Sequence, residues 1–362
     1  MTTLPLTVRQ LRARAVNAPL AKPITTSSVT IDAAALVLID LETEQGVTGH
    51  SYVFCYTTVV VKPVAELVAN LSAVLKGTSA APADIEAAMQ LRFRLLGTEG
   101  LLGIALAGID MAAWDALARA AGVPLVRLLG GEPRAIPAYN SCGMGGIDLA
   151  QRDAEETLLG GFRGMKIKIG YPELAQDIAV VRATKRAIGD KIALMVDYNQ
   201  CLSVPEAIRR CRALDDEGVT WIEEPVRADD YVGHAAVARE TRTPIQIGEN
   251  WFGTHQMAKS IDARASDLAM PEAMKIGGVS GWLRAAALAH AAGLPVSSHG
   301  FIEITAHLFP VTPTAHWLEW LNKASGILQE PPQCKNGWVT PSTAPGTGIE
   351  WNEDAVRRYL IA

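Results

Sequence analysis

The chain has 362 residues, of which 49% are hydrophobic and 20% charged, as in an ordinary globular protein. This length allows two domains, and the core is not limited by size. The net charge is −5 and no run of lysines and arginines occurs, so nucleic acid is not an expected partner.

The sequence also indicates a cytoplasmic protein without a membrane segment. Met1 to Pro19 contains arginines but no continuous apolar stretch, so no signal peptide is expected. The most apolar segment, Leu101 to Val123, is interrupted by charged residues and predicts a buried helix. The cysteines are odd in number and form no C-x-x-C pair, which favours reduced thiols; they are Cys55, Cys142, Cys201, Cys211 and Cys334.

Residues 1–130 predict an α+β domain. Alternating apolar and polar residues over Val29 to Thr43 and Val47 to Val61 predict two antiparallel strands, with a turn at Glu44-Gln45-Gly46. Helices are expected near 62–76, 83–96 and 102–121, and the last is expected to end at Gly122-Val123-Pro124.

Residues 131–320 show a different alternation, in which short apolar runs are separated by helical stretches. This pattern predicts a parallel α/β barrel. The runs are Ala135 to Ser141, Gly164 to Gly170, Ile192 to Asn199, Val219 to Pro225, Ile245 to Glu249, Leu268 to Met274, Pro295 to His299 and Ala315 to Glu319. Residues 321–362 lack this alternation and are expected to return to the first domain.

Ionisable residues lie near the ends of these runs from the second to the eighth. They are Lys166 and Lys168, Asp197, Glu223 and Glu224, Glu249, Glu272, His299, and Glu319. The C-terminal ends of barrel strands converge on one point, where barrel enzymes have their active sites. One such residue would carry little weight, but a succession of them predicts a single clustered site.

Three of the acids, Asp197, Glu223 and Glu249, each end an apolar run at nearly equal spacing. Helix capping explains one such acid well but three poorly. Several carboxylates at one barrel end need a cation, and oxygen ligands with open positions favour Mg²⁺, with Mn²⁺ as a substitute. No Cys or His shares this spacing, which disfavours zinc. Glu224 is expected to point to the other face and to be structural.

Lys166 and Lys168 are two residues apart and therefore share one face of a strand. One interpretation is a half-exposed edge strand with two solvated lysines. In the other, the two ammonium groups repel each other, which lowers the pKa of a lysine into the range of a general base.

His299 ends a short apolar run, and Glu272 ends the run before it. The histidine could be a core residue with satisfied hydrogen bonds, or a base whose tautomer the carboxylate fixes. Glu319 is flanked by bulky apolar residues. It is either a surface acid on a helix or a buried neutral carboxylic acid that donates a hydrogen bond to an oxyanion.

These residues lie in motifs through which the chain resembles the enolase superfamily, and within it the mandelate racemase subgroup, over nearly its full length. The resemblance implies a (β/α)7β modified TIM barrel with an N-terminal α+β capping domain. The motifs span residues 164–170, 195–200, 221–225, 248–251, 274–279, 297–299 and 312–319.

The resemblance also implies a role for each site residue. Asp197, Glu223 and Glu249 would bind Mg²⁺, while Lys168 and His299, the latter held by Glu272, would be bases on opposite faces of the substrate. Lys166 and Glu319 would contact the two oxygens of the substrate carboxylate. The remaining substrate-binding residues would be Asn199 at the α-hydroxyl, Ser141, and Tyr56, Ile24 and Ile31 in and beside a lid of the capping domain.

The implied activity is removal of the proton α to a carboxylate through an enediolate, which racemises a 2-hydroxy acid. A substrate with a β-hydroxyl would instead lose water, so an acid-sugar dehydratase is the alternative. The implied partners are a small-molecule carboxylate and further copies of the chain in a homo-octamer.

Four features qualify this resemblance. Glu272 replaces the Asp that normally partners the histidine, and Gly300 replaces a larger apolar residue. The lid around Lys22 to Thr30 is polar. Lys275 is expected on the sixth strand, where a sister subgroup has its second base lysine.

Two functions of other classes remain open. A Schiff-base aldolase would use Lys166 or Lys168 as nucleophile, and borohydride trapping would reveal it. A barrel that only binds a small acid would need no base. No G-x-G-x-x-G opens an early βα unit, so a Rossmann dehydrogenase is not expected.

Overall fold

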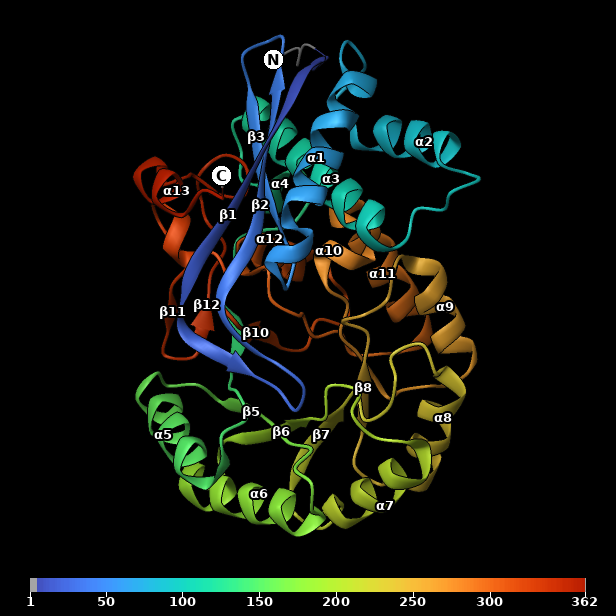
Figure 1. Ribbon diagram of the computed structural model, residues 1–362, viewed down its shortest axis with the longest axis vertical. Coiled ribbons are helices and arrows are strands. Elements are labelled where there is room, and N and C mark those ends of the chain that lie inside the picture. The colour runs from blue at the N-terminus through green and yellow to red at the C-terminus, as the bar shows by residue number, and fades with distance from the viewer. Residues whose placement is uncertain (1–4, 362) are drawn as a thin grey trace.

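The computed structural model describes residues 5–361. Residues 1–4 and 362, which belong to the expected first domain and C-terminal segment, lie outside the described range. An α+β domain stands over one end of an α/β barrel, and both ends of the described range lie on the side of the capping domain (Figure 1).

A three-stranded antiparallel sheet and the helices on it form the capping domain. One face of the first long helix packs on the sheet, and its buried residues recur at helical spacing: Val61, Val64, Val68, Leu71 and Leu75. Gly122, with φ of 68°, ends the last long helix in the left-handed region. The elements are β1 (Val8–Thr25), β2 (Thr30–Thr43), β3 (Thr48–Phe54), α1 (Thr58–Leu75), α2 (Pro82–Arg92), α3 (Gly100–Ala121) and the single turn α4 (Leu125–Leu128).

The sequence prediction for this domain was wrong at two places. The strand expected over Val47 to Val61 ends at Phe54, because Tyr56 turns the backbone at φ of 58° and Thr57 caps α1 by accepting from the Val59 amide. Strand β1 was not predicted at all. Its prolines and arginines obscure the alternation, and pairing with β2 along most of its length makes it a strand.

The barrel closes through parallel pairing from β4 to β9 and between β10 and β4. Between β9 and β10, single bridges at Val296 replace a full strand. The strands are β4 (Ile136–Ser141), β5 (Gly164–Lys168), β6 (Ala193–Asp197), β7 (Val219–Glu223), β8 (Ile245–Ile247), β9 (Leu268–Ala269) and β10 (Leu318–Trp320). The helices are α5 (Gly146–Leu159), α6 (Leu174–Ile188), α7 (Val204–Leu214), α8 (Tyr231–Glu240), α9 (Thr254–Asp262), α10 (Ala273–Ile276), α11 (Gly278–Ala292) and α12 (Ile302–Leu308).

Two expected barrel strands are shorter than predicted. The run Leu268 to Met274 is a strand only over Leu268–Ala269, and Glu272 is the N-cap of α10. Lys275 therefore lies on a helical turn and not on a strand. The run Pro295 to His299 pairs only at Val296. Apolar periodicity cannot separate a short strand from an irregular buried segment.

The tip of the β1–β2 hairpin reaches the mouth of the barrel (Figure 1). The backbone oxygen of Thr25 accepts a hydrogen bond of 2.8 Å from the amide of Met144, which follows β4. Lys22 forms ion pairs with Asp153 and Glu156 on α5. The hairpin thus joins the capping domain to the C-terminal edge of the barrel, where the predicted site residues lie.

Residues after β10 run back along the capping domain. The amide of Ile361 donates to the backbone oxygen of Ala15 on β1, at 2.9 Å. The elements of this segment are the 3-10 turn η2 (Ser325–Ile327), β11 (Cys334–Lys335), β12 (Trp338–Val339) and α13 (Glu353–Tyr359), and a further 3-10 turn, η1 (Phe309–Val311), precedes β10. The segment therefore holds the sheet and the barrel together.

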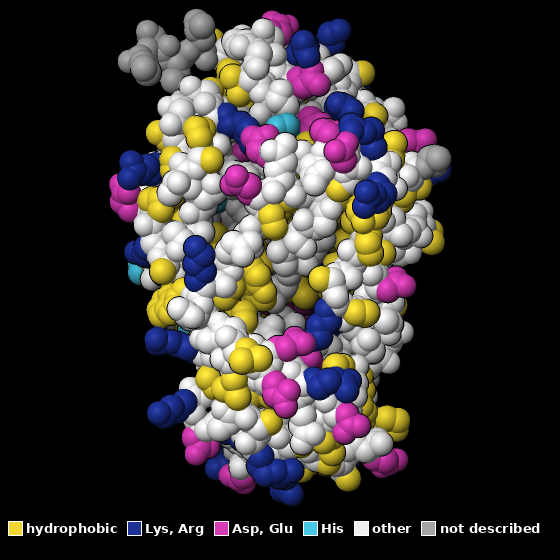
Figure 2. Space-filling view, turned by 90° about the vertical axis from the view of Figure 1, so that its left-hand side faces the viewer, with side chains coloured by type: hydrophobic (Ala, Val, Ile, Leu, Met, Phe, Trp, Pro, Cys, Tyr) yellow, Lys and Arg dark blue, Asp and Glu magenta, His cyan; other side chains and the backbone are white. Residues whose placement is uncertain are grey.

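The helices α1 and α3 are each long and apolar enough to cross a membrane, by composition alone. Most of α3 is buried, in contact with β3 and α11. The buried face of α1 packs against β1 and β2. Figure 2 shows acidic and basic side chains interspersed over one face of the molecule. Packing within the capping domain thus accounts for the apolar residues of α3 and for one face of α1.

A prediction on stability follows from Asp115, a fully buried residue of α3. Its carboxylate accepts hydrogen bonds from His50 of β3, from Arg119, and from the amide and hydroxyl of Thr347 in the C-terminal segment. Asp115→Ala leaves these donors without their acceptor and should lower the free energy of unfolding by about 3 kcal/mol, measured by denaturant titration.

The control is Asp229→Ala. Asp229 pairs only with Arg227, and both side chains are more than two-thirds exposed, so this change should cost less than about 1 kcal/mol. Equal unfolding midpoints for the two variants would contradict the role assigned to Asp115.

Candidate active site

The ionisable residues at the strand ends are brought together by the register of the barrel. Lys168 of β5 lies directly beside Asp197 of β6, which lies beside Glu223 of β7. Glu249 follows β8, and Glu319 lies on β10 next to β4. All of these side chains are buried, with at most 8% of any residue exposed. The strand-end cluster is therefore an enclosed set of charges at the C-terminal end of the barrel.

Each lysine of β5 is paired with carboxylates. Lys166 Nζ lies 2.6 Å from Glu223 Oε1 and 2.9 Å from Glu319 Oε1, and Lys168 Nζ lies 2.5 Å from Asp197 Oδ2. Burial by itself would lower the pKa of Lys168, but the charge of Asp197 raises it above the usual range. Lys166 opposes this only in part.

The predicted lowering of a lysine pKa by repulsion between the two ammonium groups is therefore wrong for this arrangement. The same holds for Lys166, since Glu223 and Glu319 outweigh burial and raise its pKa well above the usual range. The carboxylates lie closer to each ammonium than the other lysine does, so attraction exceeds repulsion.

His299 and Glu272 form a second acid–base unit. His299 Nδ1 donates to Glu272 Oε1 at 2.8 Å, and Nε2 faces Glu249 Oε2 at 3.1 Å. Burial alone would raise the pKa of Glu272, but the charges of Lys275 and His299 lower it to about 2. An ionised Glu272 can only accept a hydrogen bond, so it holds a proton on Nδ1 of His299. The other nitrogen, Nε2, faces the strand-end cluster.

Glu319 differs from its expected neutral state. Burial favours the neutral acid, but Lys166 and His299 hold the pKa of Glu319 below its usual range. Its Oε2 also accepts a hydrogen bond of 3.0 Å from the amide of Gly300. The sequence showed the apolar neighbours of Glu319 but not the ammonium group of Lys166 beside it, so the prediction was wrong here.

The acids of the cluster have the chemistry of a site for a hard divalent cation. Burial, together with the charges of Asp197 and Glu249, raises the pKa of Glu223 to about 8, although the charge of Lys166 opposes this. A cation placed among these three oxygen donors would relieve their repulsion, and Mg²⁺ prefers such donors. Within residues 5–361 no three His, Cys, Asp or Glu side chains already surround one point as metal ligands, since these three face Lys166, Lys168 and His299.

The expected substrate-binding residues lie on several elements. Asn199, at φ of 45°, donates to Asp197 Oδ2 at 2.9 Å, and its buried Oδ1 has no hydrogen-bond partner. Ser141 ends β4 and pairs with Lys166. Ile24 and Ile31 face each other across the tip of the β1–β2 hairpin.

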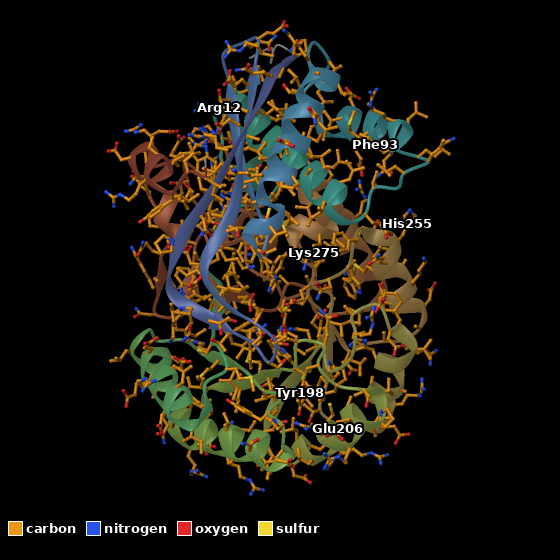
Figure 3. All side chains as sticks on the ribbon, in the orientation of Figure 1. Arg12, Phe93, Tyr198, Glu206, His255 and Lys275 are labelled. Carbon is orange, nitrogen blue, oxygen red and sulfur yellow. The ribbon has the colours of Figure 1, made fainter. Side chains whose placement is uncertain are left out.

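Tyr56 joins the capping domain to the His299 unit. Its hydroxyl donates to Glu272 Oε1 at 3.3 Å and accepts from Lys275 Nζ at 2.9 Å. Lys275 Nζ also donates to Asn250 Oδ1 at 2.7 Å. Figure 3 shows Lys275 where the capping domain meets the barrel. These polar groups form one wall above the strand-end cluster.

Glu224, Asn250 and Lys323 also lie in this region, although the sequence did not predict them for the site. Glu224 was expected on the other face, but its Oε2 accepts from Asn250 at 2.7 Å, and burial together with the charges of Glu249 and Asp197 raises its pKa. The adjacency of Glu223 and Glu224, and of Glu249 and Asn250, was the available signal. Lys323 follows β10 outside the regular alternation and gave no signal.

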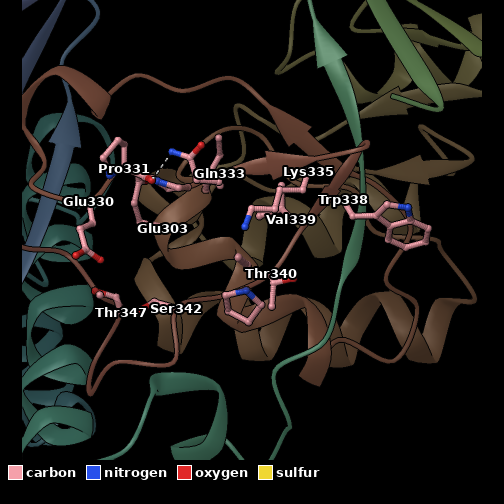
Figure 4. A pocket seen from close by; sticks show the side chains of 15 residues that line it. Glu303, Glu330, Pro331, Gln333, Lys335, Trp338, Val339, Thr340, Ser342 and Thr347 are labelled. Atoms are coloured by element: carbon pink, nitrogen blue, oxygen red, sulfur yellow. Dashed lines mark hydrogen bonds between the residues drawn. The ribbon is translucent and has the colours of Figure 1, made fainter. Parts of the chain in front are cut away.

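Several cavities among residues 5–361 lie outside the strand-end cluster, and two of them lie between elements of the fold. One, of about 330 Å³, is bounded by α12 and the segment after η2, with Glu303, Gln333 and Trp338 among its lining residues (Figure 4). The other, of about 570 Å³, lies between α2 and α3 of the capping domain and α9 to α11 of the barrel. Neither is lined by Lys166, Lys168, His299 or the three clustered acids.

An α/β barrel with acid and base side chains at its strand ends, beneath an α+β lid, defines a class of barrel enzymes. Family models place the chain within this class. Residues 8–130 match the N-terminal domain of mandelate racemase / muconate lactonizing enzyme, and residues 149–355 match the enolase C-terminal domain-like family. The chain therefore belongs to the mandelate racemase and muconate lactonizing enzyme family of the enolase superfamily.

Known relatives in this family differ in their reactions. An enolase from Bradyrhizobium, crystallised with magnesium and mandelic acid, is 46% identical, with a TM-score of 0.95 over 100% of both chains. The 3,6-anhydro-alpha-L-galactonate cycloisomerase of Streptomyces coelicolor is 31% identical over 90% of this chain and 91% of its own length. The L-talarate/galactarate dehydratase of Salmonella typhimurium is 33% identical over 72% of this chain and 67% of its own length.

A prediction on metal binding follows from the mutual repulsion of the clustered acids. Addition of Mg²⁺ to metal-free protein should raise the melting temperature, because an ion that binds only the folded state adds about 2.7 kcal/mol of stability at 100 times its dissociation constant. The Mg²⁺-induced shift should be smaller in Glu223→Gln, measured by scanning calorimetry. In the control Asp229→Asn, whose carboxylate is exposed, the shift should match that of the wild type.

If Mg²⁺ and EDTA gave the same melting temperature for the wild type, the site assigned to these three acids would be wrong.

Proposed function

We propose that the protein is a Mg²⁺-dependent racemase of a 2-hydroxy acid. It removes the proton α to the carboxylate and returns a proton to the opposite face. The observation that carries the proposal is the placement of two bases across the mouth of one barrel. Lys168 lies on β5, and His299 follows the segment that bridges β9 and β10. The charged cluster lies between them.

The two bases have different supports, which suits them to opposite faces of one substrate. Lys168 is held by Asp197 at 2.5 Å, and His299 is held by Glu272 at 2.8 Å. The proton would move to Lys168 Nζ from one enantiomer and to His299 Nε2 from the other. When one base takes the proton, the protonated form of the other base donates a proton to the opposite face of the enediolate.

Removal of this proton puts a second negative charge on the substrate carboxylate, so positive groups must converge there. Asp197, Glu223 and Glu249 would hold Mg²⁺, which supplies positive charge to this dianion when bound. Lys166 would contact one carboxylate oxygen, since its ammonium lies between Glu223 and Glu319. Glu319 would hydrogen-bond the other oxygen after taking up a proton, because the negative charge of a substrate carboxylate beside it raises its pKa. The buried Oδ1 of Asn199 has no hydrogen-bond partner, and it would accept a hydrogen bond from the α-hydroxyl of the substrate.

The lid and the wall near Tyr56 would contact the substituent on the α-carbon. Ile24 and Ile31 pair at the hairpin tip, and Tyr56 contacts Glu272 from above. The mandelic acid in the Bradyrhizobium relative supports an aromatic 2-hydroxy acid as one substrate type. Ser141, at the end of β4, would bind the substrate from the first strand of the barrel.

A second candidate function is dehydration of an acid sugar. The polar wall of Lys275, Tyr56 and Asn250 favours it, because a hydroxylated side group needs hydrogen-bond partners where a phenyl ring needs none. The relative from Salmonella with this activity supports it as well. In this reaction His299 would donate its proton to the departing β-hydroxyl.

The two functions of other classes have less support. A Schiff-base aldolase needs a lysine nucleophile but no divalent cation, so it gives Asp197, Glu223 and Glu249 no shared role. A barrel that only binds an acid would not require the paired base His299–Glu272. Membership of an enzyme superfamily also favours catalysis.

We also propose a cytoplasmic homo-octamer. The five cysteines are free, which suits a reducing compartment. Four leucines at the end of α2, in the loop after it and at the start of α3 are exposed, and they offer apolar surface to another subunit. They are Leu91, Leu95, Leu96 and Leu101.

Exchange in D₂O, followed by proton NMR with Mg²⁺ and a panel of 2-hydroxy and sugar acids, tests the proposal. With each enantiomer supplied separately, Lys168→Ala should abolish α-proton exchange from one enantiomer, and His299→Asn should abolish exchange from the other. Each variant should lower racemisation by at least about 100-fold, the usual contribution of one acid–base group.

The same spectra distinguish the alternatives. Exchange with conversion to the other enantiomer supports racemisation, and formation of a keto acid supports dehydration. Lys191→Met, an exposed lysine before β6, is the matched control and should exchange both enantiomers at the wild-type rate. If Lys275→Met alone abolished exchange from one enantiomer, His299 would not be the second base.

A further inference from the structure

Lys323 is a buried lysine for which the proposed reaction has no role. It lies in the loop between β10 and η2, four residues after Glu319, and only 4% of it is exposed. Its Nζ has no hydrogen-bond partner. Among residues 5–361, Glu272 is the only carboxylate within 4.0 Å, at 3.6 Å. A buried ammonium group without hydrogen bonds is costly, so an acceptor is expected to approach it.

Aromatic rings from both domains surround this ammonium group. Nζ lies 4.8 Å from the ring centre of Phe54, 5.7 Å from that of Phe301 and 5.8 Å from that of Tyr56. The ring faces attract the cation but accept no strong hydrogen bond. Phe54 and Tyr56 belong to the capping domain, so Lys323 lies where this domain meets the His299–Glu272 pair.

Three basic side chains lie around the carboxylate of Glu272. Lys275 and Lys323 each approach its carboxylate at 3.6 Å, and His299 donates to it at 2.8 Å. The carboxylate of Glu272, whose pKa is lowered to about 2, thus lies beside two ammonium groups. Glu303 also lies in the field of Lys323, but burial raises its pKa and one of its oxygens accepts from Tyr52. The Nζ of Lys323, which makes no hydrogen bond, is therefore the group in this region that has donors left for an anionic acceptor.

Gly300 makes room for Lys323. A Cβ at Gly300 would lie 3.0 Å from Lys323 Nζ and 3.4 Å from its Cε. Gly300 directly follows His299 and has φ of 56°, a conformation that suits glycine. The end of the lysine thus lies over the backbone beside the second base, where the larger residue expected from the family pattern would collide with it.

We propose that Lys323 is a specificity-determining residue that binds a second, distal carboxylate of the substrate. The inference rests on the proposed function, in which the reacting carboxylate lies at Lys166 and the metal-binding acids. The rest of the substrate then extends toward the capping domain, where Nζ of Lys323 supplies the charge and the free hydrogen bonds for an anionic end. The preferred substrate is therefore a dicarboxylic 2-hydroxy acid.

The test compares acids of equal length that differ at the distal end. The pairs are glucarate with gluconate, and galactarate with galactonate. For each pair we measure kcat/KM for α-proton exchange or consumption, and the dissociation constant by titration calorimetry with Mg²⁺-loaded protein. Loss of a hydrogen bond between charged groups corresponds to about 10- to 100-fold. The diacid-to-monoacid ratio should fall by this factor in Lys323→Met, mainly through KM and the dissociation constant.

Two further variants act as controls. Lys191→Met, at an exposed position before β6, should keep the wild-type ratio. Gly300→Ala should displace the lysine and lower the ratio when Lys323 is present, but cause no further fall in the ratio when combined with Lys323→Met. This cycle separates the contact from backbone strain at Gly300, which affects both acids of a pair alike. Gly300→Ala also provides a test if Lys323→Met does not fold, as judged by circular dichroism.

An unchanged ratio in folded Lys323→Met, or a wild type that does not prefer the diacid, would overturn the inference. Loss of exchange from only one enantiomer, regardless of the distal group, would also overturn it, since Lys323 would then act by positioning Glu272 and His299. If no acid exchanges but diacid binding still depends on Lys323, the proposed function fails and the binding site stands. If exchange proceeds but the diacid-to-monoacid ratio is the same in the wild type and in Lys323→Met, only the inference about Lys323 fails.

Discussion

Burial of both signs of charge at one barrel mouth is the constraint on which the site depends. An isolated charge in this position would be too costly to keep ionised, so each must lie beside an opposite one. Lys166 lies between Glu223 and Glu319, and Lys168 lies against Asp197. Because these partners come from neighbouring or converging strands, any shift in strand register would leave a buried charge unpaired.

The same pairing prepares the groups for chemistry. Opposite charges fix the side chains before a substrate arrives, so little reorganisation is needed during a reaction. The two candidate bases, Lys168 and His299, are held by different kinds of carboxylate. Lys168 is held by Asp197, itself a candidate metal ligand, whereas His299 contacts the candidate ligand Glu249 through Nε2 but is held through Nδ1 by Glu272, outside the candidate metal set. Metal binding would therefore act directly on the surroundings of Lys168 and less directly on those of Glu272.

The capping domain completes this arrangement from the other side. Tyr56 contacts Glu272, and the β1–β2 hairpin reaches the barrel beyond β4. Asp115 and the C-terminal segment tie the domain's helix α3 to the chain that follows the last barrel strand. In the proposed reaction the barrel would supply the groups for proton transfer, and the capping domain would supply much of the surface around the substituent of the substrate.

The sequence by itself determined the barrel with its capping domain, because strand periodicity and the repeated acids at strand ends are local patterns that the barrel maps onto one point. It also indicated Lys168, Asp197 and Glu223 as neighbours. Only the tertiary structure decided the charge states of Lys166 and Glu319, the helical position of Lys275 and the presence of Lys323 beside Glu272. These depend on contacts between residues far apart in the chain, and a pKa reflects such contacts and burial rather than neighbours in sequence.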